Sequence, residues 1–310
     1  MKQKTIENNH FSIFNHNSQK MKKPVMYGVC FIILTAMYYY LSSRLPFNSD
    51  QASILLEAKD ILNGNIFLDG WYLSTVPFYF TETLPLSLLS LLLGNKIFLL
   101  HLMPALYYAS IILITYSIIK TKKNSCAAFI GLILIPSPFF AINSITACVH
   151  VGAIVVALII LKSYTRNSST IENILLSVVG GLALYSDSIL LYFLIIPIFV
   201  TVITSFLIHR ATRILAHAVI PIGSIVFSKL IRLLFEEIDS FITPGTTPPR
   251  FATIEQFCFN LKIMVEAFLK LFGADILGGS IEDTKTRLAL FNLLVVIFLL
   301  SIATKNKEKS

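Results

Sequence analysis

The chain has 310 residues, of which 55% are hydrophobic and only 14% are charged. A soluble domain of this length is usually about 45–50% apolar with roughly a quarter of its residues charged, so the composition excludes an ordinary soluble domain. The net charge of +8 does not indicate nucleic-acid binding, because the basic residues lie at the ends of apolar runs and form no patch interleaved with aromatic side chains.

Several apolar runs reach the roughly 20 residues that a helix needs to cross the hydrocarbon core of a bilayer. The runs are continuous and do not alternate, which favours helices over a β-barrel. We therefore expect an all-α, polytopic integral membrane protein with about eight transmembrane helices, forming one transmembrane domain over residues 24–304. The expected spans are 24–43, 97–119, 126–144, 147–163, 171–187, 188–208, 213–235 and 286–304.

Basic residues mark every second connection between these spans, as the positive-inside rule requires of cytoplasmic loops. They are Lys20, Lys22 and Lys23, then Lys120, Lys122 and Lys123, then Lys162 and Arg166, then Arg210 and Arg213, and finally Lys305, Lys307 and Lys309. Both termini are thus expected in the cytoplasm, as tails over 1–23 and 305–310. The first span lacks a clear small-residue cleavage site, which predicts a retained signal anchor.

The acidic residues separate in the same way. Only Glu7, Glu172 and Glu308 fall on the expected cytoplasmic side, while those from Asp50 through Asp283 otherwise fall outside or at an outer helix end. Acidic residues hardly influence topology themselves, so this separation indicates an outer face with its own chemistry.

The apolar segment 84–93 is too short to span a bilayer as a helix. We expect a shallow or re-entrant helix sheltered from lipid by the rest of the protein. The alternative is that 78–94 spans, which gives nine spans and reverses the side of every later loop.

Two long outer connections, about 44–96 and 236–285, are each expected to carry an amphipathic helix lying on the membrane surface. In the first, residues 51–63 place Ala52, Leu55, Leu56, Ile61 and Leu62 on an apolar stripe, with Glu57, Lys59 and Asp60 opposite. In the second, Thr253 and Gln256 predict a capping box that begins a helix ending near Gly273.

The four cysteines form no CxxC or metal-ligand pattern; those at 30, 126 and 148 lie in or beside apolar runs and are expected to be small buried hydrophobic residues. No P-loop, G-x-S-x-G, H-E-x-x-H or Rossmann glycine pattern is present in the sequence.

Asp50 is the first candidate for chemistry, because it follows a span and stands at the start of the first surface helix. It could cap that helix, or its carboxylate could deprotonate an acceptor or hold a divalent metal beside a phosphate. Glu82 precedes the short apolar segment, where it could be a cap or could face the same cavity as Asp50.

Asp187 interrupts the apolar stretch 174–208 in Tyr-Ser-Asp-Ser and must lie at an outer helix end or in a wet cavity. His150 stands at the outer edge of a span, as an interfacial histidine, a ligand or an acid. Lys229 and Arg232 share a helix face and could snorkel outward or contact a lipid phosphate, a role also open to the outer Arg44 and Arg250.

The segments Asn-Ser-Asp-Gln-Ala, Leu-Leu-Glu-Ala-Lys-Asp-Ile-Leu-Asn-Gly-Asn-Ile and Gly-Trp-Tyr-Leu-Ser-Thr follow the first span. They resemble the first periplasmic loop of C-type glycosyltransferases, in particular bacterial relatives of the protein mannosyltransferase group. Phe-Thr-Glu-Thr-Leu-Pro-Leu, Val-His-Val-Gly, Tyr-Ser-Asp-Ser and Leu-Phe-Gly-Ala-Asp extend the resemblance over most of residues 24–280. Family members often carry an acidic pair where this chain has Asp50-Gln51, and they are commonly longer.

The resemblance implies transfer of a sugar from a polyprenyl-phosphate carrier on the outer face of the bacterial cytoplasmic membrane. It implies that Asp50 is the base toward the acceptor hydroxyl and that Glu82, His150 and Asp187 face the same cavity. We expect Glu82 and Asp187 to belong to the catalytic site and His150 to bind donor or phosphate, and we expect the same binding role of Arg44 and Arg250 from their outer position. It leaves open whether a divalent cation takes part.

The competing hypothesis is a non-catalytic membrane protein, such as a polyprenyl-sugar flippase component, an assembly subunit or a truncated inactive relative. Transporters tend to show internal repeats, and the sequence shows none, which favours the enzyme.

Overall fold

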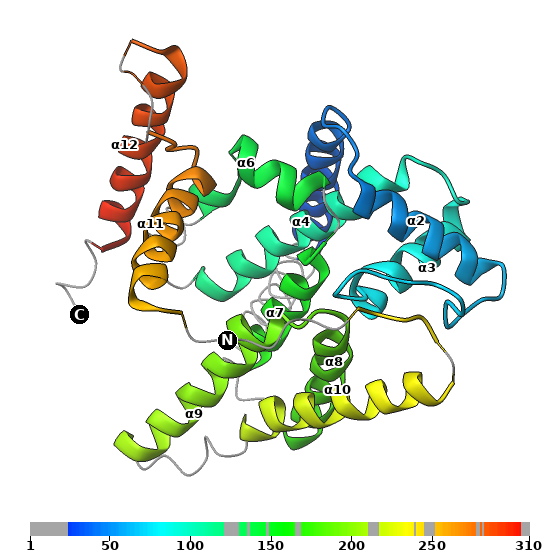
Figure 1. Cartoon of the computed structure of the whole chain (residues 1–310). Coiled ribbons are helices and arrows are strands. Elements are labelled where there is room, and N and C mark those ends of the chain that lie inside the picture. Colours follow the sequence, from blue (N-terminus) through cyan, green and yellow to red (C-terminus); the bar gives the residue numbers. More distant parts are fainter. Residues whose placement is uncertain are drawn as a thin grey trace, which may run out of the picture.

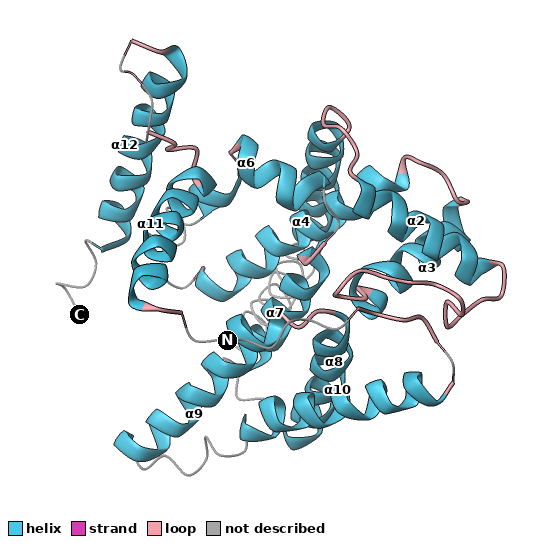
Figure 2. Cartoon of the chain, viewed as in Figure 1, coloured by secondary structure: helices cyan, strands magenta, loops and turns pink. Residues whose placement is uncertain are grey.

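The computed structural model describes residues 24–120, 130–134, 137–146, 149–164, 169–209, 217–238, 240–244, 252–276, 280 and 282–304. Within these ranges the chain is helical and has no named strand (Figure 2). The expected all-α class is therefore confirmed for this part of the chain. The two expected tails, 1–23 and 305–310, lie outside the described residues.

Among the residues that the structure describes, four helices are long and apolar enough to cross a membrane. They are Pro24–Ser42, α4 (Leu99–Ile119), the stretch Leu191–Ile208, which joins the π-helical turn η3 (Leu191–Ile195) to α9 (Ile196–His209), and α12 (Thr284–Thr304). Each coincides with an expected span. Large apolar side chains such as Ile32, Leu207 and Phe298 are more than 60% exposed on them, as a lipid-facing surface requires.

The other expected spans correspond to shorter or more polar elements. α7 (Val151–Tyr164) has 14 residues and α8 (Thr170–Ser186) has 17. At about 1.5 Å per residue they fall short of a hydrocarbon core roughly 30 Å thick. α10 (Val219–Glu237) is longer but carries Lys229 and Arg232. Of the span expected at 126–144, the structure describes 130–134, α6 (Pro138–Ala141) and the π-helical turn η2 (Ile142–Thr146).

The helix expected over 51–63 is α2 (Ser49–Leu62). Its N-cap excludes one of the two roles considered for Asp50, and the expected placement of Glu57 on its outer face is wrong. Asn48 caps it instead of Asp50: the Asn48 side chain accepts from the Gln51 amide at 2.9 Å, and the Gln51 side chain accepts from the Asn48 amide at 3.2 Å. The face packed against the protein carries Gln51, Ile54, Glu57, Ala58 and Ile61. Glu57 therefore points inward, while Leu56 is 56% exposed.

α2 packs on α3 (Leu84–Leu93), which continues directly from the π-helical turn η1 (Tyr79–Thr83). Together η1 and α3 form the apolar helix Tyr79–Leu93, whose Leu86, Ser87 and Ser90 are buried. This segment is too short to span at about 1.5 Å per residue. Figure 1 shows α2 and α3 on one side of the molecule and α11 with α12 on the opposite side.

The closest helix packing in the described chain joins α8 to α10 through small residues. A Cβ atom built at Gly181 would lie 2.5 Å from Phe227 Cβ, and one built at Gly223 would lie 2.6 Å from Ser177 Cβ. The Ser177 hydroxyl donates to the Val219 carbonyl at 2.9 Å across the same contact. Small residues that let two backbones approach are typical of helix pairs in membranes.

The connection before η1 and the segment that follows α10 are joined by backbone hydrogen bonds. Leu73 donates to the Ile242 carbonyl, and Ile242 donates to the Trp71 carbonyl, both at 2.9 Å. Tyr72 and Ile242 form an isolated parallel bridge at this point. Below it, Tyr79, Phe235 and Phe241 pack in a buried aromatic cluster. Residues 71–73 are thereby held over the end of α10.

The second surface helix, α11 (Ile254–Leu271), begins at Thr253, whose hydroxyl accepts from the Gln256 amide at 3.2 Å. The reciprocal half of the expected capping box is absent, because the Gln256 side chain donates to Asn260 at 2.8 Å. Gly273 follows the helix with φ +68°. Cys30 and Cys258 are exposed, so Cys30 is not the buried residue expected; Cys126 and Cys148 lie outside the described residues.

We predict that Gly181→Leu lowers the thermal stability of the purified protein, because the new side chain would overlap Phe227 and force α8 and α10 apart. Overpacking of this kind costs about 1–3 kcal/mol. The matched control is Gly28→Leu, since nothing lies within 4 Å of a Cβ at Gly28. Unfolding followed by intrinsic fluorescence in detergent measures both; equal midpoints for the two variants would contradict the packing described.

Candidate functional site

The site is organised around η1, which is fixed to the end of α8. Phe78, just before η1, has φ +52°. Its amide donates to the Ser186 carbonyl at 3.0 Å, and the Phe80 amide donates to the Ser186 hydroxyl at 2.8 Å. These bonds hold the start of η1 against the residue that precedes Asp187.

The second anchor of η1 is the carboxylate of Glu82, which is completely buried. One oxygen accepts the Gly152 amide at 3.0 Å, and the other accepts the hydroxyl of Thr81. Gly152 is in the first turn of α7, where backbone amides have no partner within the helix and a negative charge is stabilising. Glu82 therefore acts at least as a cap for α7.

Gly152 is required for this contact. A Cβ at this position would overlap the Thr81 carbonyl and would lie 3.0 Å from the Glu82 carboxylate. The glycine in Val-His-Val-Gly thus allows the backbone of α7 to reach η1.

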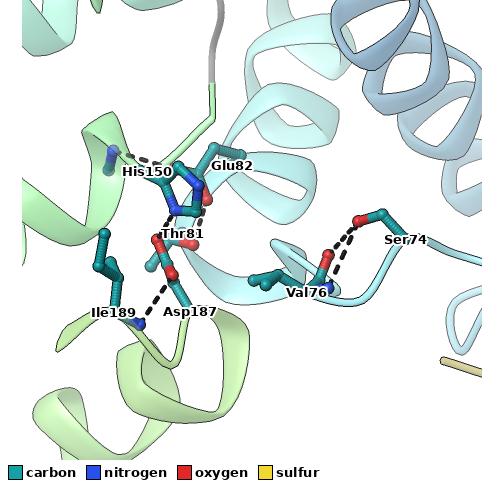
Figure 3. Close-up of polar contacts among 8 residues, drawn as sticks. Ser74, Val76, Thr81, Glu82, His150, Asp187 and Ile189 are labelled. Atoms are coloured by element: carbon teal, nitrogen blue, oxygen red, sulfur yellow. Dashed lines mark hydrogen bonds and ion pairs between the residues drawn. The ribbon is translucent and has the colours of Figure 1, made fainter. Parts of the chain in front are cut away.

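His150 and Asp187 form the clearest side-chain pair of the site (Figure 3). His150 Nδ1 lies 2.7 Å from Asp187 Oδ2, and the other Asp187 oxygen accepts the Ile189 amide at 3.1 Å. Asp187 ends α8 and its side chain is fully buried, whereas 41% of the His150 side chain is exposed. The carboxylate orients the imidazole and leaves Nε2 without a partner in the described part of the chain.

The environment of His150 favours its charged form. The hydrogen bond to Asp187 raises the pKa of His150 above its ordinary value of 6.5, and partial burial opposes this less strongly. The negative charges of Asp187 and Asp50 raise it further. Asp50, on the exposed first turn of α2, lines a small cavity together with Phe78, whose ring centroid lies 5.2 Å from that of His150.

The small cavity beside Asp50 has a volume of about 50 Å³ and is also lined by Ser53, Glu57 and the segment 76–78. Glu57 is 4% exposed and accepts the hydroxyls of Ser53 at 2.9 Å and Thr83 at 2.7 Å. Burial raises the pKa of the Glu57 carboxyl, and the two hydrogen bonds offset part of that effect.

Glu57 is the site residue that sequence reasoning missed. In the sequence, Glu57 shares a helix face with Gln51, Ile54, Ala58 and Ile61. That pattern indicates a buried carboxylate only once its hydrogen-bond partner Thr83 is known.

A second, larger cavity of about 470 Å³ lies between residues 75–77, the ends of α8 and α10, and residues 240–244. Val76 and Pro77 line both cavities, and Ser188, which follows Asp187, lines the larger one. Arg232 and Glu236 of α10 also line it.

The structure brings together Glu82, His150 and Asp187, with Asp50 nearby. Arg44 is separate: it is exposed, lies 4.9 Å above the Tyr40 ring and donates to the Tyr40 hydroxyl at 3.3 Å. Arg250 lies outside the described residues. Among the residues that are described, no group of three or more His, Cys, Asp and Glu side chains could hold a metal ion.

Comparison with family models, with curated proteins and with solved structures finds no match to this chain.

We predict that His150→Gln lowers thermal stability more at about pH 5.5 than at about pH 8.5. The folded-state pKa of His150 is raised, so the pairing with Asp187 stabilises the fold fully below the unfolded-state pKa. That contribution is lost as the pH rises through the folded-state pKa. Unfolding midpoints of the two proteins across this range measure the difference.

The same comparison made in an Asp187→Asn background is the control, because the pH dependence of the difference should then be lost. A difference that is constant with pH in the wild-type background would show that the imidazole does not titrate against Asp187.

Proposed function

We propose that this protein transfers a sugar from a polyprenyl-phosphate carrier to an acceptor on the outer face of the cytoplasmic membrane. The observation that carries the proposal is the pairing of a buried Asp187 with a half-exposed His150, whose neighbour Phe78 lines the same small cavity as Asp50. These are residues that the resemblance to C-type glycosyltransferases singles out.

In the proposed reaction the acceptor hydroxyl attacks the anomeric carbon of the sugar. The bond from that carbon to the carrier phosphate breaks, and the phosphate leaves with the bonding electrons. Asp50 takes the proton of the hydroxyl as general base. His150, whose raised pKa favours the imidazolium, neutralises charge on the leaving phosphate.

The two buried carboxylates have positioning roles in this scheme. Asp187 fixes the ring of His150, and Glu82 fixes the start of α7, which immediately follows His150. Neither is exposed enough to reach an acceptor. The expectation that Glu82 and Asp187 act directly on substrate is therefore replaced by the proposal that they act through His150.

We propose eight spans, two of which contain the short helices α7 and α8, with 84–93 as a re-entrant helix and both termini in the cytoplasm. The alternation of basic and acidic connections supports this arrangement. So does the placement of Asp50, His150 and Asp187 in one neighbourhood, because the eight-span arrangement puts all of them on the outer side.

The second candidate is a non-catalytic membrane protein. It is favoured by the full use of Glu82 and Asp187 as caps, since each accepts a backbone amide at a helix end or in the turn that follows it. The same hydrogen bonds would form if the two carboxylates had a purely structural role.

We predict that Asp50→Asn and His150→Gln each reduce transfer from a polyprenyl-phosphate hexose to products by about 10²–10⁴-fold, the usual contribution of a general acid or base. The full chain in proteoliposomes, with radiolabelled sugar on the carrier, provides the measurement. Asp69→Asn is the matched control, because Asp69 is exposed in the same loop and lines neither cavity.

Unchanged transfer by a well-folded Asp50→Asn protein would remove Asp50 from the mechanism. If the wild-type chain binds the carrier but forms no product with any acceptor offered, the non-catalytic alternative is supported.

We predict, for the topology, that a cysteine at Tyr72 reacts with an impermeant thiol reagent in intact cells and that one at Lys120 does not. Tyr72 is 69% exposed on the first outer loop, and Lys120 follows α4 in the first basic loop. The four native cysteines are replaced beforehand. Labelling at Lys120 in intact cells would exclude the eight-span arrangement.

A further inference from the structure

The cavity of about 470 Å³ contains charged groups that the proposed transfer does not use. Arg232 and Glu236 both line it from α10, one helical turn apart. An arginine and a glutamate at this spacing commonly pair with each other. Here neither forms an ion pair within the part of the chain that the structure describes, and both side chains are exposed. The cavity therefore presents a cation and an anion separately.

The wall beside these charges is aromatic. The rings of Tyr185, Phe235 and Phe241 line the cavity, and their centroids lie 5.3 to 6.4 Å apart. Arg232 and Glu236 line the same cavity as these rings. The faces of aromatic rings attract an ammonium group through the ring quadrupole, and a carboxylate attracts it through its charge.

Arg232 supplies the complementary function. The planar guanidinium matches the oxygens of a phosphate with two parallel hydrogen bonds. A ligand with a phosphate alone would bring its charge against Glu236, and an uncharged ligand would leave both charges without partners. The lining thus fits a ligand that carries a phosphate and an ammonium group a short distance apart.

The outer surface of α10 indicates how such a ligand could arrive. Leu230, Leu233 and Leu234, on the same stretch of helix as Arg232, are 52%, 57% and 52% exposed. Acyl chains could lie along these leucines while the head group enters the cavity.

We propose that this cavity binds a phosphoethanolamine head group, with the phosphate on Arg232 and the ammonium between Glu236 and the aromatic rings. The ligand is a membrane phospholipid or free O-phosphoethanolamine, which present the same chemistry. No bond is made or broken, and the binding stands apart from the proposed sugar transfer.

The test is calorimetric titration of the full chain, purified in a maltoside detergent, with three probes. They are O-phosphoethanolamine, dihexanoyl phosphatidylethanolamine and dihexanoyl phosphatidylglycerol. We expect the ethanolamine lipid to bind at least about tenfold more tightly than the glycerol lipid, the effect of one charged contact. Binding of the free head group as well would place the whole interaction in the cavity; binding of the lipid alone would assign the ligand to the membrane.

Two pairs of variants on α10 separate the cavity from the helix surface. Arg232→Gln should weaken both lipids about tenfold, and Glu236→Gln should remove the preference for ethanolamine over glycerol. Lys229→Gln and Glu237→Gln make the same charge changes at exposed positions that do not line the cavity, and should leave binding unchanged.

Equal affinity for the two lipids would overturn the proposal. So would equal losses in the control variants, or no binding of any ethanolamine probe by a protein that still unfolds cooperatively.

Discussion

The contact between the Glu82 carboxylate and the Gly152 amide is the constraint on which the rest of the site depends. A fully buried carboxylate without hydrogen-bond partners is costly, so η1 and the first turn of α7 must stay together. Because Ser186 holds the other end of η1, the same turn connects α7 to the end of α8. His150 precedes α7 and Asp187 ends α8, so their 2.7 Å contact follows from how η1 is held.

The site has a buried layer and an exposed layer. Glu57, Glu82 and Asp187 are inside, and each accepts hydrogen bonds from hydroxyls or backbone amides. His150 and Asp50 are the groups that solvent or a ligand can reach. This arrangement explains why single residues looked ambiguous in the sequence. The inner carboxylates hold helix ends in place, and the exposed position of His150 depends on the buried Asp187.

The sequence predicted the features that depend on local patterns. Hydropathy located the long helices, and the polar break at Tyr-Ser-Asp-Ser located the end of α8. The helical pattern placed Glu57 on the exposed face of α2, which is wrong. The hydrophobic stripe was chosen from the apolar residues of the helix alone, and it ignores the polar partner Thr83 that another segment supplies. The ladder between residues 71–73 and 242 was equally invisible, since it joins segments about 170 residues apart through backbone groups alone. Arg44 was assigned to the site because it was expected on the same side of the membrane. Being on the same side does not mean that its side chain lies close to the other residues.

The small-residue contact between α8 and α10 has a consequence for both proposed binding places. One helix of the pair ends at Asp187, and the other carries Arg232 and Glu236 near its end. Two helices whose backbones meet through glycine and serine have little room to slide or rotate against each other. The pair therefore works as a rigid spacer: whatever occupies the larger cavity is held at a constant offset from the imidazole of His150, independent of the surrounding loops.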